Sequence, residues 1–198
     1  MLIKICGMRD ARTVDAAIEA GADALGFVFA ESPRRVTPDE ARRATAQVPS
    51  DVLRVAVMLH PAAQDWQAVQ DAFEPDVLQT DAADFDYLDV PDGIERWPVV
   101  REGDATLTVP PQFVYEGRKS GKGQTVDWGY AAGLAARGRM ILAGGLDAGN
   151  VAEAIAKVRP FGVDTSSAVE IAPGQKDPDK IRAFIRAARA AAKESGKR

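Results

Sequence analysis

The only cysteine of the 198-residue chain stands at the end of a short apolar segment, Ile3-Lys4-Ile5-Cys6-Gly7. Side chains alternate along a strand, so Lys4 and Cys6 share one face of it and the two isoleucines share the other. Because a lysine is almost never buried without a partner, the Lys4 face is not ordinary core. A lone cysteine is often a small buried hydrophobe, but an ammonium beside it lowers the pKa of the thiol. Lys4 and Cys6 together therefore predict a reactive thiolate at the carboxyl end of the first strand.

Asp127 and an arginine pair are the other candidates for chemistry on a charged substrate. Asp127 follows a glycine- and lysine-containing segment, residues 117–125, and directly precedes a helix. It is either the N-cap of that helix, worth about 1 kcal/mol, or a general acid delivered by the loop. Arg34 and Arg35 follow the second expected strand. An arginine there is either a solvated charge or a forked contact for an anionic substrate.

Two segments near the carboxyl terminus have the composition of phosphate sites. Gly144-Gly145 follows the seventh expected strand, and Ser166-Ser167-Ala168 follows the eighth. Each has a structural alternative, a turn for the glycines and a helix cap for the serines. Barrels of alternating strands and helices commonly bind phosphate after strands seven and eight, where glycines allow close approach and hydroxyl and amide groups donate hydrogen bonds. Because the two segments follow consecutive strands, we expect them to form one phosphate site.

Strand and helix signals alternate along the whole chain and must position these residues. Apolar segments predict eight strands, at residues 3–6, 22–29, 51–59, 75–79, 94–100, 112–116, 140–143 and 161–164. Helical patterns follow most of them, at residues 11–20, from 38 onward, and at 61–73, 128–137, 147–158 and 177–192, with caps at Asp10 and Thr37 and a stop at Gly21. Only one or two turns fit after the fourth strand, and little room for a helix remains after the fifth.

This order predicts an α/β fold, a (β/α)8 barrel formed by residues 1–198 as a single domain. A doubly wound open sheet is the competing architecture. It normally has fewer strands and often a glycine fingerprint after the first, which is absent here. In a closed barrel the eighth strand lies beside the first, so we expect Asp164 to be the partner of Lys4.

Composition restricts the class of partner and the compartment. Charged residues make up 27% of the chain, and 25 basic against 29 acidic side chains give a net charge of −4, which argues against a general nucleic-acid or anionic-membrane surface. One cysteine cannot form an internal disulfide, which favours a reducing cytoplasm. No stretch approaches the roughly 18 apolar residues of a membrane helix, and no targeting segment is recognisable. We expect a cytoplasmic monomer or homodimer that binds a small molecule.

The single histidine, His60, has no second histidine or cysteine cluster to complement it. A zinc site is therefore not expected, and no Ser-His-Asp order suggests nucleophilic catalysis. We expect His60 to be a surface residue at the end of the third strand.

Six motifs, in this order, resemble those of the phosphoribosylanthranilate isomerase family of tryptophan biosynthesis: Lys4-Ile5-Cys6-Gly7, Gly26-Phe27-Val28-Phe29, Ser32-Pro33-Arg34-Arg35-Val36, Asp127-Trp128, Gly144-Gly145-Leu146 with Asn150, and Asp164-Thr165-Ser166-Ser167. The resemblance covers nearly the whole chain. It implies a cofactor-independent Amadori rearrangement of N-(5′-phosphoribosyl)anthranilate to the 1-deoxyribulose 5-phosphate derivative. It also implies a TIM barrel that needs no metal.

The resemblance also implies a role for each candidate residue. Asp127 would be the general acid that opens the sugar ring, and Cys6, as thiolate, the general base that removes the C2′ proton. The two roles need a lowered thiol pKa and a raised carboxyl pKa. Arg35 matches the arginine that would hold the anthranilate carboxylate. The residues that would bind substrate around the phosphate are Gly144, Gly145, Asp164, Ser166, Ser167 and Ala168.

Three departures from the family pattern leave alternatives open. Leu78-Gln79-Thr80-Asp81 stands where the family usually has Gln-Leu-His-Gly, Glu116 replaces a usual aspartate after strand six, and Ala168 replaces a usual glycine. None of them affects the acid or the base. A related barrel isomerase acting on another amino-sugar phosphate, and a paralogue that binds a phosphorylated ligand with weakened turnover, are the two alternatives to the isomerase.

Overall fold

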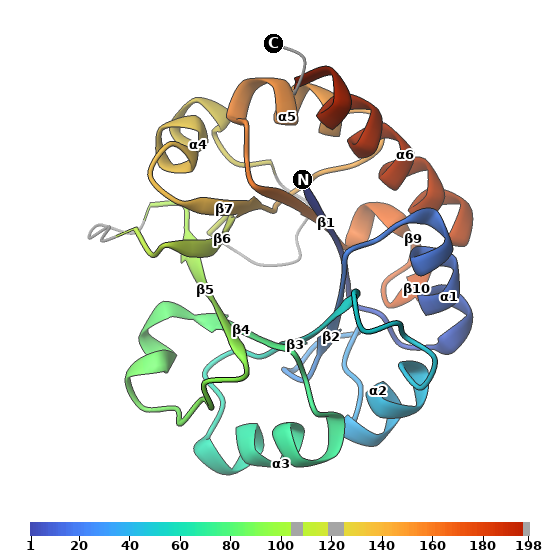
Figure 1. Cartoon of the computed structure of the whole chain (residues 1–198), viewed down its shortest axis with the longest axis vertical. Coiled ribbons are helices and arrows are strands. Elements are labelled where there is room, and N and C mark those ends of the chain that lie inside the picture. The colour runs from blue at the N-terminus through green and yellow to red at the C-terminus, as the bar shows by residue number, and fades with distance from the viewer. Residues whose placement is uncertain (104–108, 119–124, 196–198) are drawn as a thin grey trace.

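Eight parallel strands close into a barrel in the computed structural model, which describes residues 1–103, 109–118 and 125–195. The strands follow one another around the barrel in chain order, and β1 pairs with both β2 and β8 (Figure 1). Their bounds are β1 (Leu2–Cys6), β2 (Ala24–Val28), β3 (Leu53–Val57), β4 (Val77–Asp81), β5 (Glu95–Arg101), β6 (Gln112–Glu116), β7 (Arg139–Leu142) and β8 (Gly162–Thr165). The predicted fold class is therefore confirmed.

Among the described residues, six α-helices surround the barrel (Figure 1), and their bounds are α1 (Ala11–Ala20), α2 (Pro38–Ala44), α3 (Ala63–Phe73), α4 (Trp128–Ala135), α5 (Val151–Val158) and α6 (Pro178–Ser195). The 3-10 helix η1 (Ala82–Asp86) takes the place of a full helix after β4, as expected. Part of the connection from β5 to β6, residues 104–108, lies outside the described residues, and so do residues 119–124 of the glycine-containing segment 117–125. None of the helices in the described part of the chain is long and apolar enough to span a membrane.

Local chemistry sets the helix ends. Asp10 caps α1 by accepting a hydrogen bond from the Thr13 amide at 2.9 Å, and Gly21 ends the helix with a left-handed φ of 93°. Thr37 and Glu40 form a capping box at the start of α2. The helix α5 begins at Val151 instead of the predicted residue 147, because the Asp147 side chain accepts from the amides of the next residues and forms a turn first.

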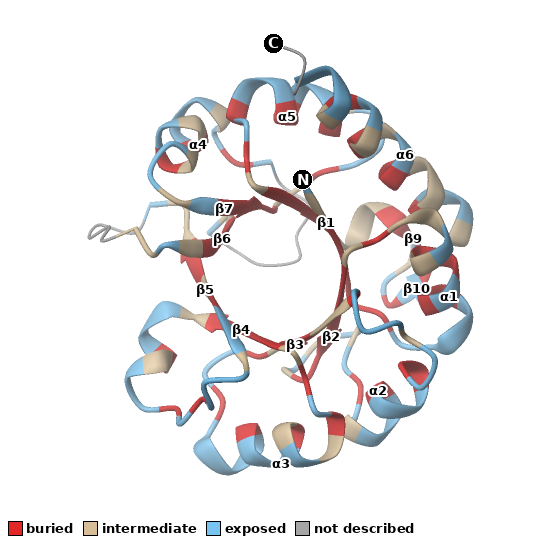
Figure 2. Ribbon diagram, viewed as in Figure 1, coloured by how far each residue is buried: buried red, intermediate tan, exposed pale blue. Residues whose placement is uncertain are grey.

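The barrel has two apolar layers. Ile3 and Ile5 belong to the large layer between the strands and the helices, where the strands are almost wholly buried (Figure 2). The smaller layer fills the barrel interior and consists of Ala24, Val55, Val77, Trp97, Val99, Val114, Ile141 and Ala143. Since the isoleucines point outward, the alternation of β1 directs Lys4 and Cys6 inward, as the sequence predicts.

A feature that the sequence patterns do not predict follows β8. A 3-10 turn, η2 (Ser167–Val169), leads into a two-stranded antiparallel hairpin of β9 (Glu170–Ala172) and β10 (Gln175–Lys176). The chain then enters α6, which packs against α1 and α5. This hairpin places two further charged residues, Glu170 and Lys176, near the end of β1.

Candidate active site

One rim of the barrel gathers the candidate residues. All strand pairs of the barrel are parallel, so the carboxyl ends of its strands lie on the same side. Cys6 ends β1, Ser166 follows β8, Gly144 follows β7, and Asp127 lies between β6 and α4. Four consecutive strands thus supply the thiol, the two suspected phosphate segments and the acid. In barrels of this kind the carboxyl rim carries the active site.

Lys4 and Asp164 form the ion pair that the sequence predicts. Lys4 is fully buried, its partner in register across β1 and β8 is Asp164, and its Nζ donates to Asp164 Oδ1 at 3.0 Å. Burial lowers the pKa of Lys4, but the charges of Asp164 and Cys6 and the hydrogen bonds to them together raise it by more, so it lies above its ordinary value. The lysine therefore stays charged beside Cys6.

The Cys6 thiol lies against Gly26 of β2, the residue paired with it in the sheet. A Cβ placed on Gly26 would stand 2.9 Å from Cys6 Sγ, so any residue other than glycine would displace the thiol. Cys6 is buried, with 8% of its surface exposed. Burial raises the pKa of the thiol, and the charges of Lys4 and Lys176, which lower it, do not offset that effect. The expected lowering of the Cys6 pKa is therefore wrong for the protein without substrate.

Asp127 is exposed and caps α4. Its Oδ1 accepts hydrogen bonds from the amides of Gly129 at 2.7 Å and Tyr130 at 3.0 Å, and its own amide donates to Glu102 Oε1 at 2.9 Å. The two amide donors lower the pKa of Asp127. The N-cap interpretation is thus confirmed, and the raised pKa expected of a general acid is absent without substrate.

The glycine pair after β7 has the geometry of an anion site. Gly144 and Gly145 both have left-handed φ angles, 91° and 61°. Neither amide has a hydrogen-bond partner among the residues that the structure describes, whereas Asn150 Nδ2 donates to the Gly145 carbonyl at 2.8 Å and fixes the turn. Successive free amides in such a turn form a concavity for an anion.

The serines after β8 differ from each other. The Ser166 hydroxyl donates to the Cys6 carbonyl at 3.0 Å and accepts from Lys176 at 3.2 Å, so it ties β8 to the end of β1. Ser167 and Ala168 lie in η2 and are half-buried beside this contact. Their amides and the Ser167 hydroxyl remain the candidates for a phosphate, together with the glycine turn.

The two arginines have different environments. Arg34 donates through Nε and Nη2 to the two oxygens of Glu170, each at 2.8 Å, and its side chain packs on Gly7. Arg35 is exposed and borders a cleft that also contains His60. Nothing in the sequence favours Arg34 over Arg35. Glu170, its partner, lies 136 residues away along the chain.

Two of the residues that depart from the family pattern, Asp81 and Glu116, belong to one charged network at the rim. Arg101 of β5 pairs with Asp81 of β4 and with Glu116 of β6, each at 2.5 Å. His60, exposed as predicted, has its Nδ1 2.9 Å from the buried Asp84 Oδ1. The departures on β4 and β6 are thus joined through a single cation. No cluster suited to a metal ion occurs among the described residues.

Comparison with known proteins gives the same picture over the full length. The sequence pattern of the family N-(5'-phosphoribosyl)anthranilate (PRA) isomerase matches residues 3–187. The N-(5'-phosphoribosyl)anthranilate isomerase of Pelobacter propionicus is 38% identical over 206 residues, which cover 98% of each chain. The structure of TrpF from Jonesia denitrificans is 36% identical, has a TM-score of 0.78, and is matched over 98% of its length by 97% of this chain.

A structure with a bound ligand is also similar. It is a phosphoribosyl anthranilate isomerase in complex with reduced 1-(o-carboxyphenylamino)-1-deoxyribulose 5-phosphate, 30% identical, with a TM-score of 0.77. The similarity covers 96% of this chain and 100% of that one. The barrel fold is therefore shared with proteins of this family over nearly the whole chain.

Proposed function

The chain belongs to the N-(5'-phosphoribosyl)anthranilate isomerase family, and we propose that its rim residues catalyse that family's reaction in tryptophan biosynthesis. The reaction is the Amadori rearrangement of N-(5′-phosphoribosyl)anthranilate to 1-(2-carboxyphenylamino)-1-deoxyribulose 5-phosphate, and the residues require no cofactor for it. The observation that carries the proposal is the order of groups on the rim. An acid, two segments suited to phosphate and a thiol follow β6, β7, β8 and β1.

The phosphate of the substrate binds between the two catalytic groups in this proposal. The free amides of Gly144 and Gly145 donate to it from the β7 side. Ser167 and Ala168 donate from the β8 side, and Ser166 supports them through its hydrogen bonds to β1. With the phosphate fixed there, the ribose extends across the mouth, within reach of both the thiol and the acid.

Asp127 and Cys6 share the proton transfers. Asp127 donates its proton to the ring oxygen, the C1′–oxygen bond breaks, and a protonated Schiff base forms. The Cys6 thiolate then takes the proton from C2′, and the electron pair of that bond moves to give an enolamine. The enolamine tautomerises to the ketone. One group gives a proton and the other takes one, which is ordinary general acid–base catalysis.

The substrate itself corrects the unfavourable pKa shift of Asp127. Its phosphate and carboxylate bring negative charge near Asp127, and like charge with loss of water raises the pKa of a carboxyl group. The Cys6 thiol already faces Lys4, whose charge favours the thiolate against the effect of burial. The working protonation state of Asp127 therefore belongs to the complex with substrate.

An arginine after β2 holds the anthranilate carboxylate. Arg35 is the residue expected from the sequence pattern, and it is exposed. Arg34 is the alternative that the geometry favours, because it packs on Gly7 directly after the thiol. We also propose that the protein is a monomer or homodimer and is located in the cytoplasm.

The test is turnover of phosphoribosylanthranilate, followed through the loss of its fluorescence. We expect turnover by the wild-type chain and a kcat at least about a hundredfold lower for both Cys6→Ser and Asp127→Asn, since each removes a proton-transfer group. Near-native kcat in either variant contradicts that residue's role. Turnover of another ribosyl amine phosphate only would identify a related isomerase. Tight binding of product without turnover would identify a binding paralogue.

A further inference from the structure

The β9–β10 hairpin brings together two buried charges that the acid–base steps do not use. Glu170 and Lys176 are paired in register across the hairpin, and Lys176 Nζ donates to Glu170 Oε1 at 2.9 Å. Glu170 is 6% exposed and Lys176 is 5% exposed. Buried charges are costly unless they are paired, and both are fully engaged here. Their other contacts lead to two different parts of the active site.

Glu170 leads to Arg34. The two hydrogen bonds from Arg34 to Glu170 form a fork, which fixes the plane of the guanidinium as well as its position. A Cβ placed on Gly7 would lie 2.6 Å from Arg34 Cδ, so the arginine lies directly on the turn that follows Cys6. Without Glu170, the Arg34 side chain could adopt many rotamers.

Lys176 leads to Cys6. Its Nζ donates to the Ser166 carbonyl at 2.8 Å and to the Ser166 hydroxyl at 3.2 Å. The Ser166 hydroxyl in turn donates to the Cys6 carbonyl at 3.0 Å. Lys176 therefore holds the loop after β8 against the end of β1, and it places a second cation, after Lys4, near the thiol.

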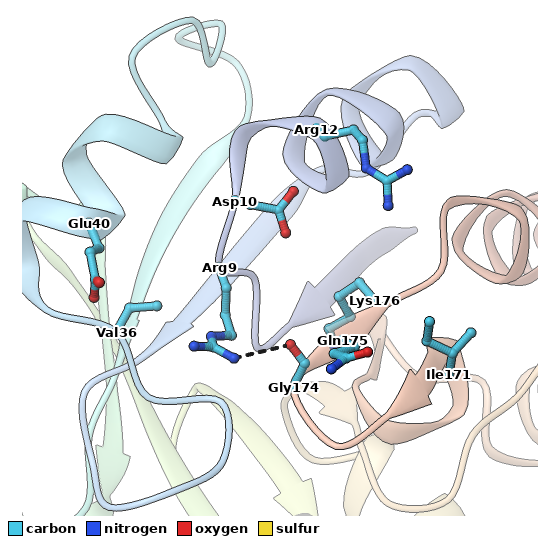
Figure 3. A pocket seen from close by; sticks show the side chains of 9 residues that line it. All are labelled: Arg9, Asp10, Arg12, Val36, Glu40, Ile171, Gly174, Gln175 and Lys176. Atoms are coloured by element: carbon cyan, nitrogen blue, oxygen red, sulfur yellow. Dashed lines mark hydrogen bonds between the residues drawn. The ribbon is translucent and has the colours of Figure 1, made fainter.

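The hairpin is itself held from outside the barrel. Its turn residue Gly174 has a φ of 79° and packs so closely on the Pro33 carbonyl that no side chain fits there. Arg9 Nη1 donates to the Gly174 carbonyl at 3.5 Å, across a cleft whose wall includes Lys176 (Figure 3). Lys180 Nζ donates to the Glu170 carbonyl at 2.7 Å. A hairpin fixed at its turn and at its first strand presents Glu170 and Lys176 in constant positions.

We propose that Glu170 and Lys176 are positioning residues of the isomerase: Glu170 orients Arg34 toward the anthranilate carboxylate of the substrate, and Lys176 holds Ser166 on the Cys6 end of β1 and keeps positive charge near the thiol. This inference rests on the proposed function for its substrate. Neither residue contacts the substrate, and each acts through another residue.

The Glu170 part is tested by a double-mutant cycle with Arg34. We expect Glu170→Gln to raise KM for phosphoribosylanthranilate about tenfold while kcat changes by less than about threefold, as for loss of uniform binding. In an Arg34→Ala background, Glu170→Gln should raise KM no further. An unchanged KM in Glu170→Gln, or an equal rise in both backgrounds, overturns the assignment. If Glu170→Gln does not fold, Glu170→Asp replaces it, with a smaller rise in KM that Arg34→Ala again abolishes.

The Lys176 part is tested without substrate. Cys6 is the only cysteine, so the ultraviolet absorbance of the thiolate reports its titration directly. The charged groups that act on the thiol are Lys4, Asp164 and Lys176. We expect Lys176→Met to move the titration about one pH unit upward, because a neighbouring cation is lost, and Lys176→Gln to do the same while keeping a donor for Ser166.

The controls separate charge from folding and from the proposed function. Lys176→Arg keeps the charge and should titrate close to wild type. Lys193→Met removes an exposed lysine at the end of α6 and should change nothing. A Cys6 titration that is the same in Lys176→Gln as in wild type overturns the role of Lys176. If the wild-type chain fails to turn over phosphoribosylanthranilate, the proposed function falls, yet this titration still decides whether Lys176 acts on the thiol.

Discussion

Gly26→Ala tests whether the rate depends on the exact place of the thiol. The backbone at Gly26 suits any residue, so the substitution acts only through the space around the new Cβ. That atom would stand 2.9 Å from Cys6 Sγ, 3.2 Å from Cys6 Cα and 3.2 Å from Lys4 Cε, whereas ordinary contact begins at 3.4 Å. The thiol must therefore move by about half an ångström or more, and the adjoining strands can give way only little in a close-packed barrel.

The size of the effect follows from that displacement. Overpacking of this kind costs about 1–3 kcal/mol of unfolding free energy. A reacting group displaced by about 1 Å loses about a hundredfold in rate, so a displacement half as large predicts a kcat lower by about ten- to a hundredfold. Urea unfolding measures the first quantity and the fluorescence assay measures the second. A folded Gly26→Ala protein that has lost stability but keeps native kcat would refute the role of Cys6 as base.

Gly133→Ala is the matched control for this experiment. Gly133 lies inside α4, and a Cβ there meets nothing within 4 Å. Alanine in a helix interior is favoured over glycine by about 0.5–1 kcal/mol, so this variant should be slightly more stable. Its kcat should equal that of the wild type. A loss of activity here would mean that the assay responds to changes unrelated to the thiol.

Three further predictions concern the rim. Arg34→Ala should raise KM about ten- to a hundredfold at similar kcat, as expected for a hydrogen-bonded charge, and Arg35→Ala should leave KM unchanged in the same assay. Asp84→Ala should cost about 2–4 kcal/mol in urea unfolding, because the buried carboxylate accepts from the His60 amide, the Thr80 hydroxyl and other donors that would be left unsatisfied. The hydrogen bond to Asp84 raises the pKa of His60 above 6.5, so its stabilisation is complete below that pH and is lost as the pH rises through the higher folded-state value. The loss should be at most about 1 kcal/mol because His60 is mostly exposed, and His60→Gln should abolish that pH dependence in urea titrations.

Much of the fold could be predicted because its signals are local. The bounds of α1 match the prediction because Asp10 and Gly21 act on the residues next to them. The inward face of β1 follows from alternation alone, and Asp164 follows from closure of the barrel, which makes the last strand the neighbour of the first. These inferences need only short-range stereochemistry and one topological rule.

The rest of the site could not be predicted because its contacts are distant and its elements are short. The strands β9 and β10 have three and two residues, too few for any periodic pattern. The role of Glu170 cannot be inferred from the sequence, because its partner Arg34 lies far away along the chain. The expected pKa direction comes from one neighbour for Cys6 and from the role that the resemblance implies for Asp127, whereas burial and two amide donors decide the two directions. The identity of a neighbour is readable from a motif, but the extent of burial is not.

The charges around the thiol favour the binding of an anionic substrate at this site. Lys4, Lys176 and Arg34 are three cations, and their buried partners Asp164 and Glu170 are only two carboxylates. With a neutral Cys6 thiol, the cluster therefore carries one uncompensated positive charge, although the whole chain is negative. Either the thiolate or the carboxylate of a bound substrate can neutralise it, and the first is disfavoured by burial. The anionic substrate therefore neutralises the positive charge that the thiolate would otherwise neutralise, so substrate binding and ionisation of the thiol draw on the same excess charge.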